Sequence, residues 1–537
     1  MLIELRVLLG PNADIPAPAI RVTLAPPIEA GIDLCALTDR IAHAADAFVG
    51  PAVSRTGRDG TVVVAFPWRY EGTGEALGDA LVQVLRRGPD VPLDERIAEA
   101  AQQVRTTDPG DPPHLLDPSI PTVAVTGTNG KTTTTRLRGR MAAEAGLRAA
   151  WSSTDGVFVA GQCIEPGDWS GPGGARLVLG EPGVGFAVLE TARGGLMLRG
   201  MGVSAVDVAV FTNVSPDHLG LQGIDTVEML AWAKSTVVRV VRPGGWAVLN
   251  AEDPLVRQYH DAGAGRPWFF ALDADSEGAA MARGLGARLT TVHDGRIVVE
   301  GLNSGAGGGP LDLGAVLDIP VTVAGLSREN LANALAAASA GLAAGLPAGA
   351  VSAGLQSFRP DTTTSPGRMN IWTVPTPDGG SATVILDFAH NEAGAEALFR
   401  VGTGLRRPGA ALHASIGNAG DRTDEGIAEV GRLAGEAADT VQLAAKPHYL
   451  RGRTQEEIDA LQRAGVRRAG KEPVEAVPDE PTGLRALLAR AHDGDVLAMM
   501  IHQDRAACVA ILDELGATAD DPSTIRAKVQ AARTAAP

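Results

Sequence analysis

The sequence predicts an α/β protein of 537 residues in which two domains are built on mainly parallel sheets. From Thr122 onward, short apolar runs alternate with helical stretches, a pattern typical of strand–helix–strand units. A Pro- and Thr-rich segment at 359–366 interrupts this alternation, which then starts again. We therefore expect an N-terminal α+β domain over 1–112, a central domain over 113–364 and a C-terminal domain over 365–537.

The N-terminal region has short elements of both kinds. Apolar runs at Leu2–Leu9 and Thr61–Phe66 predict strands, and the stretch near Glu75–Arg86 predicts a helix. The passage TTDPGDPPHLLDPSIP at 106–121 is polar and rich in proline, which is typical of a linker. These features indicate a small α+β domain that ends before the central one.

The central region begins with an apolar strand at Thr122, a Gly-rich turn, and a helix that closes near Gly146. Later segments continue the alternation and include one loop and one Ala-rich helix. Further strands are expected at Phe186–Leu189, Val206–Val214 and 246–250, the loop at 303–310, and the helix at 328–345. Strands alternating with helices predict a parallel sheet covered on both faces.

The C-terminal region repeats this organisation. Four strand candidates, with helical stretches between them, lie at 382–390, 411–420, 440–448 and 495–503. They predict a Rossmann-like parallel sheet. The polar, Ala-rich tail from Thr518 is expected to be a frayed helix.

The composition excludes several function classes. Apolar residues make up 45% and charged residues 20%, as in globular proteins. The 47 basic and 63 acidic residues give a net charge of −16, and no run is rich in Lys and Arg. An acidic chain of this kind is unsuited to binding a phosphate backbone over a broad surface. We expect no nucleic-acid partner.

The N-terminal stretch has no basic segment before its short apolar run and no small-residue cleavage site. A run of about 18 apolar residues, the length needed to span a membrane, is not found. Cys35, Cys163 and Cys508 lie far apart in the sequence and make no metal-binding pattern. We expect a cytoplasmic protein without a membrane role.

The strongest local motif is the Gly-rich turn between the strand at Thr122 and the helix that follows it. Its residues are Gly127, Thr128, Asn129, Gly130, Lys131, Thr132 and Thr133. Glycines let backbone N–H groups turn toward an anion, and the helix N-terminus adds a partial positive charge. Lys131 can reach the β- and γ-phosphates, while the Thr132 hydroxyl can ligate Mg²⁺. The motif predicts a nucleoside triphosphate site in a P-loop ATPase domain, although Val125 stands where the full motif has its first glycine.

Two acidic or imidazole positions follow later strands of the same predicted sheet. Glu190 ends GFAVLE, and Asp217 and His218 follow VDVAVFTNVSP. Open parallel sheets bind ligands at the carboxyl ends of their strands, so these side chains are expected beside the phosphate loop. A carboxylate suits Mg²⁺, and a neutral histidine can hold a second cation less typically.

Lysine is rare in this chain, which uses 42 arginines and only five lysines. A retained lysine hints that a primary amine matters, because the two side chains are not chemically interchangeable. Lys131 lies in the phosphate loop. Lys234 lies in an apolar helical stretch, where burial can lower its pKa and a neutral amine can react with CO₂ to give a carbamate. A surface lysine on an amphipathic helix is the plainer alternative.

Several motifs in order resemble the Mur ligase superfamily of ATP-dependent amide-forming ligases. GTNGKTT is followed by a strand-end Glu, NVSPDH, AK at 233–234 and NAEDP. LETARGG, LDFAHNEAG, GDRTDE and LRGR are similar to the Mur-ligase half of the cyanophycin synthetases. The likeness spans about 113–516, and LLGPN at 8–12 is faintly similar to the start of those enzymes. The ATP-grasp domain that lies between these parts in those enzymes is missing here.

The resemblance implies that the loop binds ATP, that Thr132 and Glu190 ligate one Mg²⁺, and that His218 and a carbamylated Lys234 serve a second metal position. It implies further contacts with the nucleotide, some of them from a C-terminal domain that closes over it, and contacts with an amino acid. The implied nucleotide contacts are Asn250, Asp253, Asn330, Arg368, Asp387, His390 and Asn391. The implied amino-acid contacts are Asp421, Arg422, Arg451 and Arg453.

Some of these residues have plainer interpretations. His390 can be a hydrogen-bonded core histidine, and Arg422 and Arg453 can be exposed charges. The family's DYAHNP is DFAHNE here, which removes a tyrosine hydroxyl and a proline and puts nucleotide affinity or substrate specificity in doubt.

The implied chemistry is phosphoryl transfer to a carboxylate, followed by attack of an amine on the acyl phosphate. The expected substrates are an amino acid and a peptide or polymer acceptor, and a separate ATP-grasp enzyme is a candidate partner. The N-terminal domain is a candidate module for homo-oligomerisation or acceptor docking. A polyglutamate-type ligase, as in folylpolyglutamate synthases, and a nucleotide-binding scaffold without activity remain alternatives.

Overall fold

The computed structural model describes residues 2–28, 31–57, 59–88, 90–217, 219–302, 309–473 and 475–534. It divides into two compact units. The first contains Met1–Thr135, Ala145–Phe269 and Ser339–Leu346; the second contains Arg136–Glu144, Phe270–Ala338 and Pro347–Pro537. The predicted boundaries at 112/113 and 364/365 stay predictions. Part of the loop expected at 303–310 lies outside the described residues.

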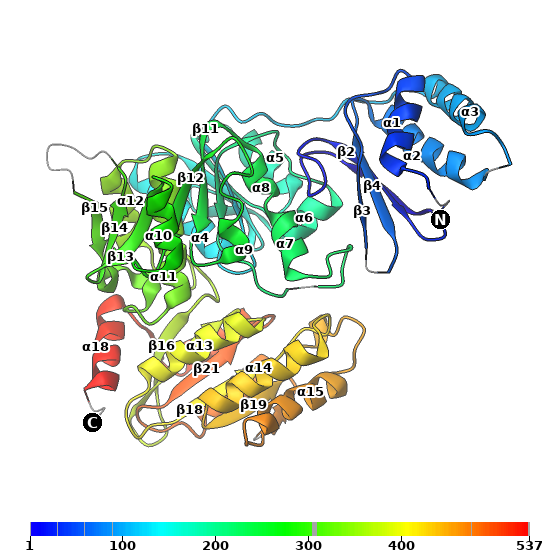
Figure 1. Cartoon of the computed structure of the whole chain (residues 1–537). Helices are drawn as coiled ribbons and strands as arrows, with labels where there is room; N and C mark the ends of the chain where they lie inside the picture. The colour runs from blue at the N-terminus through cyan, green and yellow to red at the C-terminus, as the bar shows by residue number, and fades with distance from the viewer. Residues whose placement is uncertain are drawn as a thin grey trace. The chain divides into compact units, whose positions relative to one another are not determined.

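The N-terminal part of the first unit is an antiparallel sheet covered by helices, as an α+β domain requires (Figure 1). Its strands, in the spatial order β1-β2-β4-β3, are β1 (Leu2–Leu8), β2 (Ala19–Leu24), β4 (Val62–Pro67) and β3 (Val53–Thr56). Its helices are α1 (Leu34–Ala44), α2 (Glu71–Arg86) and α3 (Leu93–Thr106). Ile20, Phe66 and Leu81 pack in one apolar core between them. The sequence interpretation found β1, β4 and α2 but not the other four elements.

A mainly parallel sheet forms the rest of the first unit. Its strands, in spatial order, are β11 (Val241–Asn250), β10 (Val206–Phe211), β5 (Thr122–Thr126), β9 (Phe186–Glu190), β6 (Ala149–Ser153), β7 (Gly156–Val159) and β8 (Gln162–Pro166). The pairs from β11 to β6 are parallel, and β6-β7-β8 is antiparallel. Strands β5 and β9 are wholly buried, which explains their continuous apolar runs.

The helices around this sheet include the one that follows the Gly-rich turn. They are α4 (Lys131–Glu144), α5 (Pro172–Gly180), α6 (Arg193–Leu198), α7 (Val227–Lys234), α8 (Thr236–Arg239) and α9 (Pro254–Arg257). The predicted strand–turn–helix unit at Thr122 is confirmed, since β5 leads through the turn into α4.

The chain then continues through four more strands and the helices between them. The elements are β12 (Arg266–Ala271), α10 (Glu277–Gly284), β13 (Arg288–His293), β14 (Arg296–Glu300), β15 (Leu311–Ala315), two short 3₁₀ turns (Val316–Asp318 and Pro320–Thr322), α11 (Arg328–Ala343) and α12 (Ala348–Ser357). The β13-β14 and β14-β15 pairs are antiparallel. The sequence interpretation found α11 but none of these strands.

The second unit also holds a seven-stranded sheet that is parallel in its centre. In spatial order its strands are β20 (Glu475–Val477), β19 (Thr440–Ala444), β18 (Leu412–Ile416), β21 (Val496–Met500), β17 (Ser381–Asp387), β16 (Asn370–Pro375) and β22 (Thr518–Ala519). The strands from β20 to β17 are parallel, as expected, and β16 is antiparallel to both neighbours.

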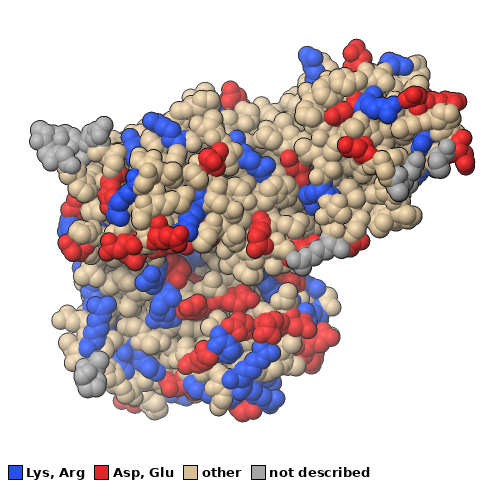
Figure 2. Space-filling model, viewed as in Figure 1, with Lys and Arg blue, Asp and Glu red and all other residues tan. Residues whose placement is uncertain are grey.

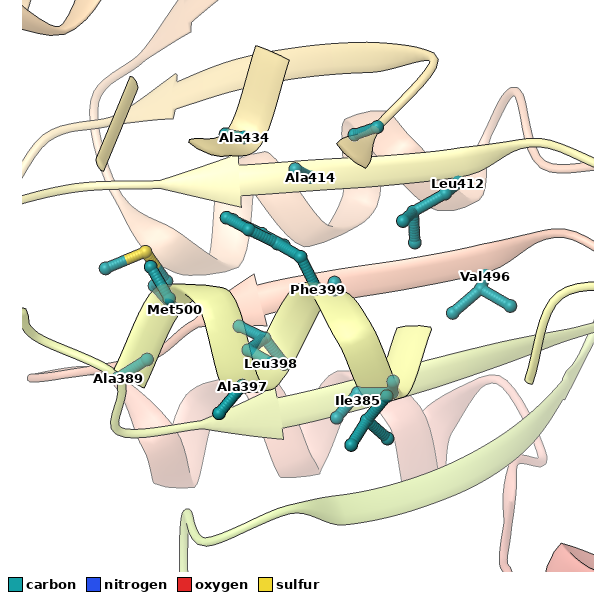
Figure 3. Packing of buried hydrophobic residues seen from close by; sticks show 14 of the residues in the cluster. Ile385, Ala389, Ala397, Leu398, Phe399, Leu412, Ala414, Ala434, Val496 and Met500 are labelled. Carbon is teal, nitrogen blue, oxygen red and sulfur yellow. The ribbon is translucent and has the colours of Figure 1, made fainter. Parts of the chain in front are cut away.

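Helices cover both faces of this sheet because its strands are apolar on both sides. They are α13 (Glu392–Leu405), α14 (Asp424–Ala437), a 3₁₀ turn (Pro447–Tyr449), α15 (Gln455–Arg468), α16 (Glu480–Leu488), α17 (Arg505–Glu514) and α18 (Pro522–Arg533). Figure 3 shows Leu398 and Phe399 of α13 packed against the strands that carry Ile385, Ala414 and Met500. Alternate strand residues point to the other face, where they meet α16 and α17.

The helix expected in the C-terminal tail is confirmed, but it is packed against the core and not frayed. Helix α18 is capped by the Asp521 carboxylate, which accepts a hydrogen bond from the Thr524 backbone N–H at 2.7 Å. Its Ile525 and Val529 side chains are each 4% exposed and belong to the core of the C-terminal sheet. The tail is mostly polar in sequence, but Ile525 and Val529 lie four residues apart. They therefore share one face of the helix, and that face is buried.

Within the described part of the chain, no helix combines the length and apolarity that a membrane span needs. Figure 2 shows acidic and basic side chains interspersed over α14 and α15. Arg432 pairs there with Glu429 and Glu436, and Arg468 pairs with Glu425. Charges of both signs on one surface do not make the basic stripe that a nucleic acid needs.

Candidate active site

The phosphate loop lies where β5 ends and α4 begins, at the carboxyl edge of the parallel sheet. Gly127 and Gly130 have positive φ angles, of 150° and 85°, which side chains other than glycine rarely adopt. A side chain on Gly127 would also overlap the Thr212 hydroxyl. The glycines are therefore required by the shape of the loop, which turns its backbone toward the N-terminus of α4.

The loop is held by the segment that follows the neighbouring strand β10. The Thr128 N–H donates to the Asn213 carbonyl at 2.9 Å, and the Asn129 N–H donates to Asn213 Oδ1, also at 2.9 Å. The Thr212 hydroxyl donates to the Asn129 carbonyl at 2.7 Å. Sequence reasoning quoted this segment as a motif but gave Asn213 no role. Its place directly after a buried strand was the available signal.

Thr132, in the first turn of α4, contacts Glu190, the last residue of β9. The Thr132 hydroxyl donates to Glu190 Oε2 at 3.0 Å, and both residues are buried. A buried hydroxyl and carboxylate beside a phosphate loop are the donors that Mg²⁺ takes, since it usually keeps waters and phosphate oxygens as its other ligands. No cluster of three His, Cys, Asp or Glu side chains occurs among the described residues. The Thr132 hydroxyl and the Glu190 carboxylate therefore fit a Mg²⁺ site in which the protein supplies only a few of the ligands.

The side chain of Lys131 contacts the backbone of the loop that contains it. Its ammonium donates to the carbonyl oxygens of Gly127 at 3.2 Å and Thr128 at 2.9 Å. The side chain is half-buried and begins the first turn of α4. The ammonium therefore lies at the loop that the motif assigns to phosphate binding.

Lys234 is the last residue of α7, and its side chain is buried, with 3% of the residue exposed. Its ammonium donates to the Gly127 carbonyl at 2.6 Å. Burial holds the pKa of Lys234 well below its usual value, and the nearby charges of Lys131 and Arg193 lower it further. Asp217 and Glu190 oppose this shift. The surface-lysine interpretation is therefore wrong, because the side chain is inside the protein.

His218, which the sequence predicts as a metal ligand, lies outside the described residues. Asp217, which precedes it, acts electrostatically on Lys234 and on Arg193. The predicted role of His218 as a metal ligand stays a prediction.

Asn250 and Asp253 make local bonds in the first unit. Asn250 Nδ2 donates to the Thr212 carbonyl at 2.9 Å. Asp253 caps α9 and also accepts a hydrogen bond from the Val214 N–H at 2.7 Å. Burial raises the pKa of Asp253, and the hydrogen bonds it accepts oppose this rise. Both side chains thus brace the segment after β10, and their expected nearness to the nucleotide base stays a prediction.

In the second unit, Asp387 ends β17 and accepts a hydrogen bond from the Met369 N–H at 2.8 Å. Burial raises the pKa of Asp387 to about 6, against the opposing effect of Arg368. The Arg368 guanidinium lies over the Phe388 ring, 4.7 Å from its centroid. His390 Nδ1 lies 3.0 Å from the Phe388 carbonyl oxygen, and Asn391 caps α13.

The remaining predicted residues of this unit lie on α11 and on two loops. Asn330 Oδ1 accepts a hydrogen bond from Asn333 on the same helix at 3.2 Å. Arg453 donates to the Gly420 carbonyl at 2.9 Å and to Asp424 at 2.6 Å. It therefore clamps the loop that carries Asp421 and Arg422. The guanidinium of Arg451 lies 5.7 Å from the centroid of the Tyr449 ring.

Sequence reasoning missed a buried polar cluster at the carboxyl edge of this sheet. Lys446, two residues after β19, forms an ion pair with Glu480, the first residue of α16. The Glu480 carboxylate also accepts hydrogen bonds from the His502 N–H at 2.7 Å and the Asp504 N–H at 2.8 Å. Burial holds the pKa of His502 well below its usual value. The scarcity of lysine, which singled out Lys131 and Lys234, could have singled out Lys446 too.

Two family models match the chain. The Mur ligase middle domain matches residues 125–341, and the glutamate ligase domain of the Mur ligases matches residues 367–500. The first covers the phosphate loop, Glu190 and Lys234, and the second covers Asp387, Lys446 and most of the C-terminal sheet.

Relatives and solved structures agree with these matches. A cyanophycin synthetase of Crocosphaera subtropica is 33% identical over 382 residues, which is 71% of this chain and 42% of the relative. One of Synechocystis sp. is 36% identical over 60% of this chain and 35% of the relative. The chain thus spans about two-fifths of the length of these relatives. The structure of Escherichia coli FolC in complex with ADP, without folate substrate, has a TM-score of 0.54 at 22% identity and covers 74% of this chain and 90% of FolC. That likeness shows a shared fold.

Proposed function

Because the chain belongs to the Mur ligase superfamily, we propose that it is an ATP-dependent ligase that joins the amine of an amino acid to a carboxylate of a peptide or polymer. The products are an amide, ADP and phosphate, formed through an acyl phosphate. The observation that carries the proposal is the convergence of three groups on one loop. Thr132 and Glu190 are hydrogen-bonded to each other, and Lys234 is hydrogen-bonded to Gly127.

In the first step, a carboxylate oxygen of the acceptor attacks the γ-phosphorus of ATP, and the bond to the bridging oxygen of ADP breaks. The protein's part is positioning and charge stabilisation, as in other phosphoryl transfers. The N–H groups of the loop that are not bonded to Asn213, together with the ammonium of Lys131, would bind the phosphates. Thr132 and Glu190 would hold Mg²⁺, which neutralises charge that develops on the phosphate oxygens.

In the second step, the amine nitrogen attacks the acyl carbon, the bond to phosphate breaks, and the nitrogen loses a proton. We assign the amino acid to the loops at the carboxyl edge of the C-terminal sheet, with Asp421, Arg422, Arg451 and Arg453 as its contacts. We also propose that Lys234 is carbamylated. Its burial and lowered pKa favour the neutral amine that reacts with CO₂. A carbamate there would supply a second anionic metal ligand.

The acceptor and the amino acid are proposed from the relatives. The likeness to cyanophycin synthetases favours arginine and an aspartate-containing acceptor. A separate ATP-grasp enzyme would then supply the aspartate backbone. Extension of a glutamate chain is the second candidate, because the model that matches residues 367–500 is the glutamate ligase domain of the Mur ligases.

The test is phosphate release from ATP and Mg²⁺ with single amino acids, each combined with β-Asp-Arg dipeptide, polyaspartate or oligoglutamate. One pair should stimulate release at least tenfold, and mass spectrometry should find the amide product. Lys131→Ala should abolish this release, whereas Lys471→Ala, at a lysine outside the site, should not. ATP binding without stimulation by any pair, or full activity of Lys131→Ala, would overturn the proposal.

A further inference from the structure

The N-terminal domain is joined to the parallel sheet of the first unit by its segment Leu9–Asp14, which we call the docking segment. The Leu9 N–H donates to the Arg199 carbonyl at 2.9 Å, and the Met201 N–H donates to the Pro11 carbonyl at 2.7 Å. Two backbones therefore run side by side directly after α6. This close approach depends on the absence of side chains at two glycines.

Gly10 and Gly200 face each other in this contact. A side chain on Gly10 would overlap the Met201 carbonyl oxygen, and one on Gly200, whose φ is 78°, would overlap the Gly10 carbonyl oxygen. Ala13 of the docking segment is fully buried, in a cluster with Met197 of α6 and Ala233 of α7. The docking segment thus packs against both helices.

A buried group of charges reinforces the contact. Asp14 pairs with Arg21 of β2 at 2.5 Å and with Arg55 of β3 at 3.1 Å. The Asp14 side chain is 3% exposed, that of Arg21 is 5% exposed and that of Arg55 is 20% exposed. Burying such charges is costly unless they are well paired, and their partners are then strongly constrained.

Arg21 and Arg55 also contact α6 and α7, respectively. Arg21 Nη1 donates to the Met197 carbonyl, in the last turn of α6, at 2.5 Å. A cation at this end of a helix also complements the partial negative charge of its carbonyl groups. The Arg55 guanidinium lies 5.5 Å from the centroid of the Trp232 ring, on α7.

The two helices are adjacent in the chain to the proposed catalytic residues. Helix α6 begins at Arg193, three residues after Glu190, and α7 ends at Lys234, two residues after Trp232. We propose that Asp14, Arg21 and Arg55 are positioning residues for the ligase reaction. They hold α6 and α7 so that Glu190 and Lys234 keep their places at the phosphate loop. This inference rests on the proposed function. It means that the N-terminal domain contributes to phosphoryl transfer by positioning Glu190 and Lys234.

The test uses Arg55→Ala and Arg21→Lys in the full chain. Arg55 is partly exposed, so its loss should leave the fold intact, and Arg21→Lys keeps the charge but not the two-sided hydrogen bonding. Arg40→Ala is the matched control, because Arg40 pairs with Asp94 on the surface of the same domain. Arg55→Lys, which keeps a cation over the ring, should restore part of any loss.

The expected result is a fall in kcat of at least tenfold for Arg55→Ala and for Arg21→Lys, because displacement of a catalytic group by about 1 Å can cost about 100-fold. For Arg55→Ala, the KM for the amino acid and the melting temperature should stay near those of the parent. Hydrogen exchange should speed up in 227–234 for Arg55→Ala. An unchanged kcat in a folded Arg55→Ala protein would overturn the inference.

The assays distinguish failure of the proposed function from failure of the positioning inference. Lys131→Ala and Glu190→Gln are assayed beside these variants with the same substrates. If they remain active, the proposed function fails. If they are inactive while Arg55→Ala and Arg21→Lys have normal kcat values, only the positioning inference fails.

Discussion

Lys446 and Glu480 form a fully buried ion pair that joins the segment after β19 to the first residue of α16. Their side chains are 1% and 0% exposed. The Lys446 ammonium also donates to the Met500 carbonyl at 2.8 Å, and burial lowers the pKa of Lys446 against the opposing charge of Glu480. Because backbone N–H groups of 502–504 donate to the same carboxylate, the pair organises the loop that carries His502.

Glu480→Gln should destabilise the protein by about 3 kcal/mol, because it leaves the Lys446 charge buried without its partner. Urea unfolding monitored by circular dichroism measures this loss. The double variant Lys446→Met with Glu480→Gln should recover most of it, since no buried charge remains. A loss below about 1 kcal/mol in the single variant would contradict this account.

Lys234→Arg should lower kcat by at least about 100-fold, because a guanidinium cannot form the proposed carbamate and cannot be neutral at this position. Steady-state phosphate release measures the effect. In Lys234→Ala, short carboxylic acids such as propionate should restore part of the activity by supplying a carboxylate. Lys528→Arg, at a lysine paired with Asp520 in the second unit, is the control and should remain active. A fully active Lys234→Arg enzyme would rule out the need for a primary amine.

The raised pKa of Asp387 predicts a specific pH dependence of stability. Its pKa is about 6 in the folded protein and 3.8 in the reference state, so the folded form binds more protons between these pH values. Its contribution to stability therefore falls as pH rises from about 4 to about 6 and stays low above that. Asp387→Asn should be more stable than the parent at pH 7.5, by on the order of 1 kcal/mol after allowance for solvent screening.

The same comparison at pH 4 is the internal control for Asp387→Asn. There the parent carboxyl is largely protonated in the folded protein, so the two proteins should unfold at nearly the same urea concentration. If Asp387→Asn were more stable than the parent by the same free energy at both pH values, the charge of the carboxyl group would not be the cause of the difference.

Ile525→Ala should lower the stability of the C-terminal sheet by about 2 kcal/mol, because it removes a buried side chain from the core between α18 and that sheet. Differential scanning calorimetry measures the shift in melting temperature. Gln530→Ala, on the exposed side of the same helix, should change it little. Equal effects of both substitutions would mean that α18 is not packed as described.

Some elements that the sequence interpretation missed had a local signal. The β13 and β14 strands are joined by Asp294-Gly295, whose φ angles are 48° and 71°. Asp-Gly between two β-branched runs is a strong indicator of a tight hairpin. The phosphate loop was found because all its information lies in seven consecutive residues, whereas Ile525 and Val529 were hidden in a polar tail.

The sequence by itself determined the elements whose physics is local: the glycines that turn the phosphate loop, the buried strands of the parallel sheets, and the presence of Lys131 and Thr132 at the start of a helix. The tertiary structure alone decided which distant groups share a desolvated environment. It buries Lys234 against Gly127, pairs Lys446 with Glu480, and brings Asp14 and Arg21 against α6. The reason is that desolvation and ion pairing depend on neighbours distant in the chain, and no local pattern of residues records those neighbours.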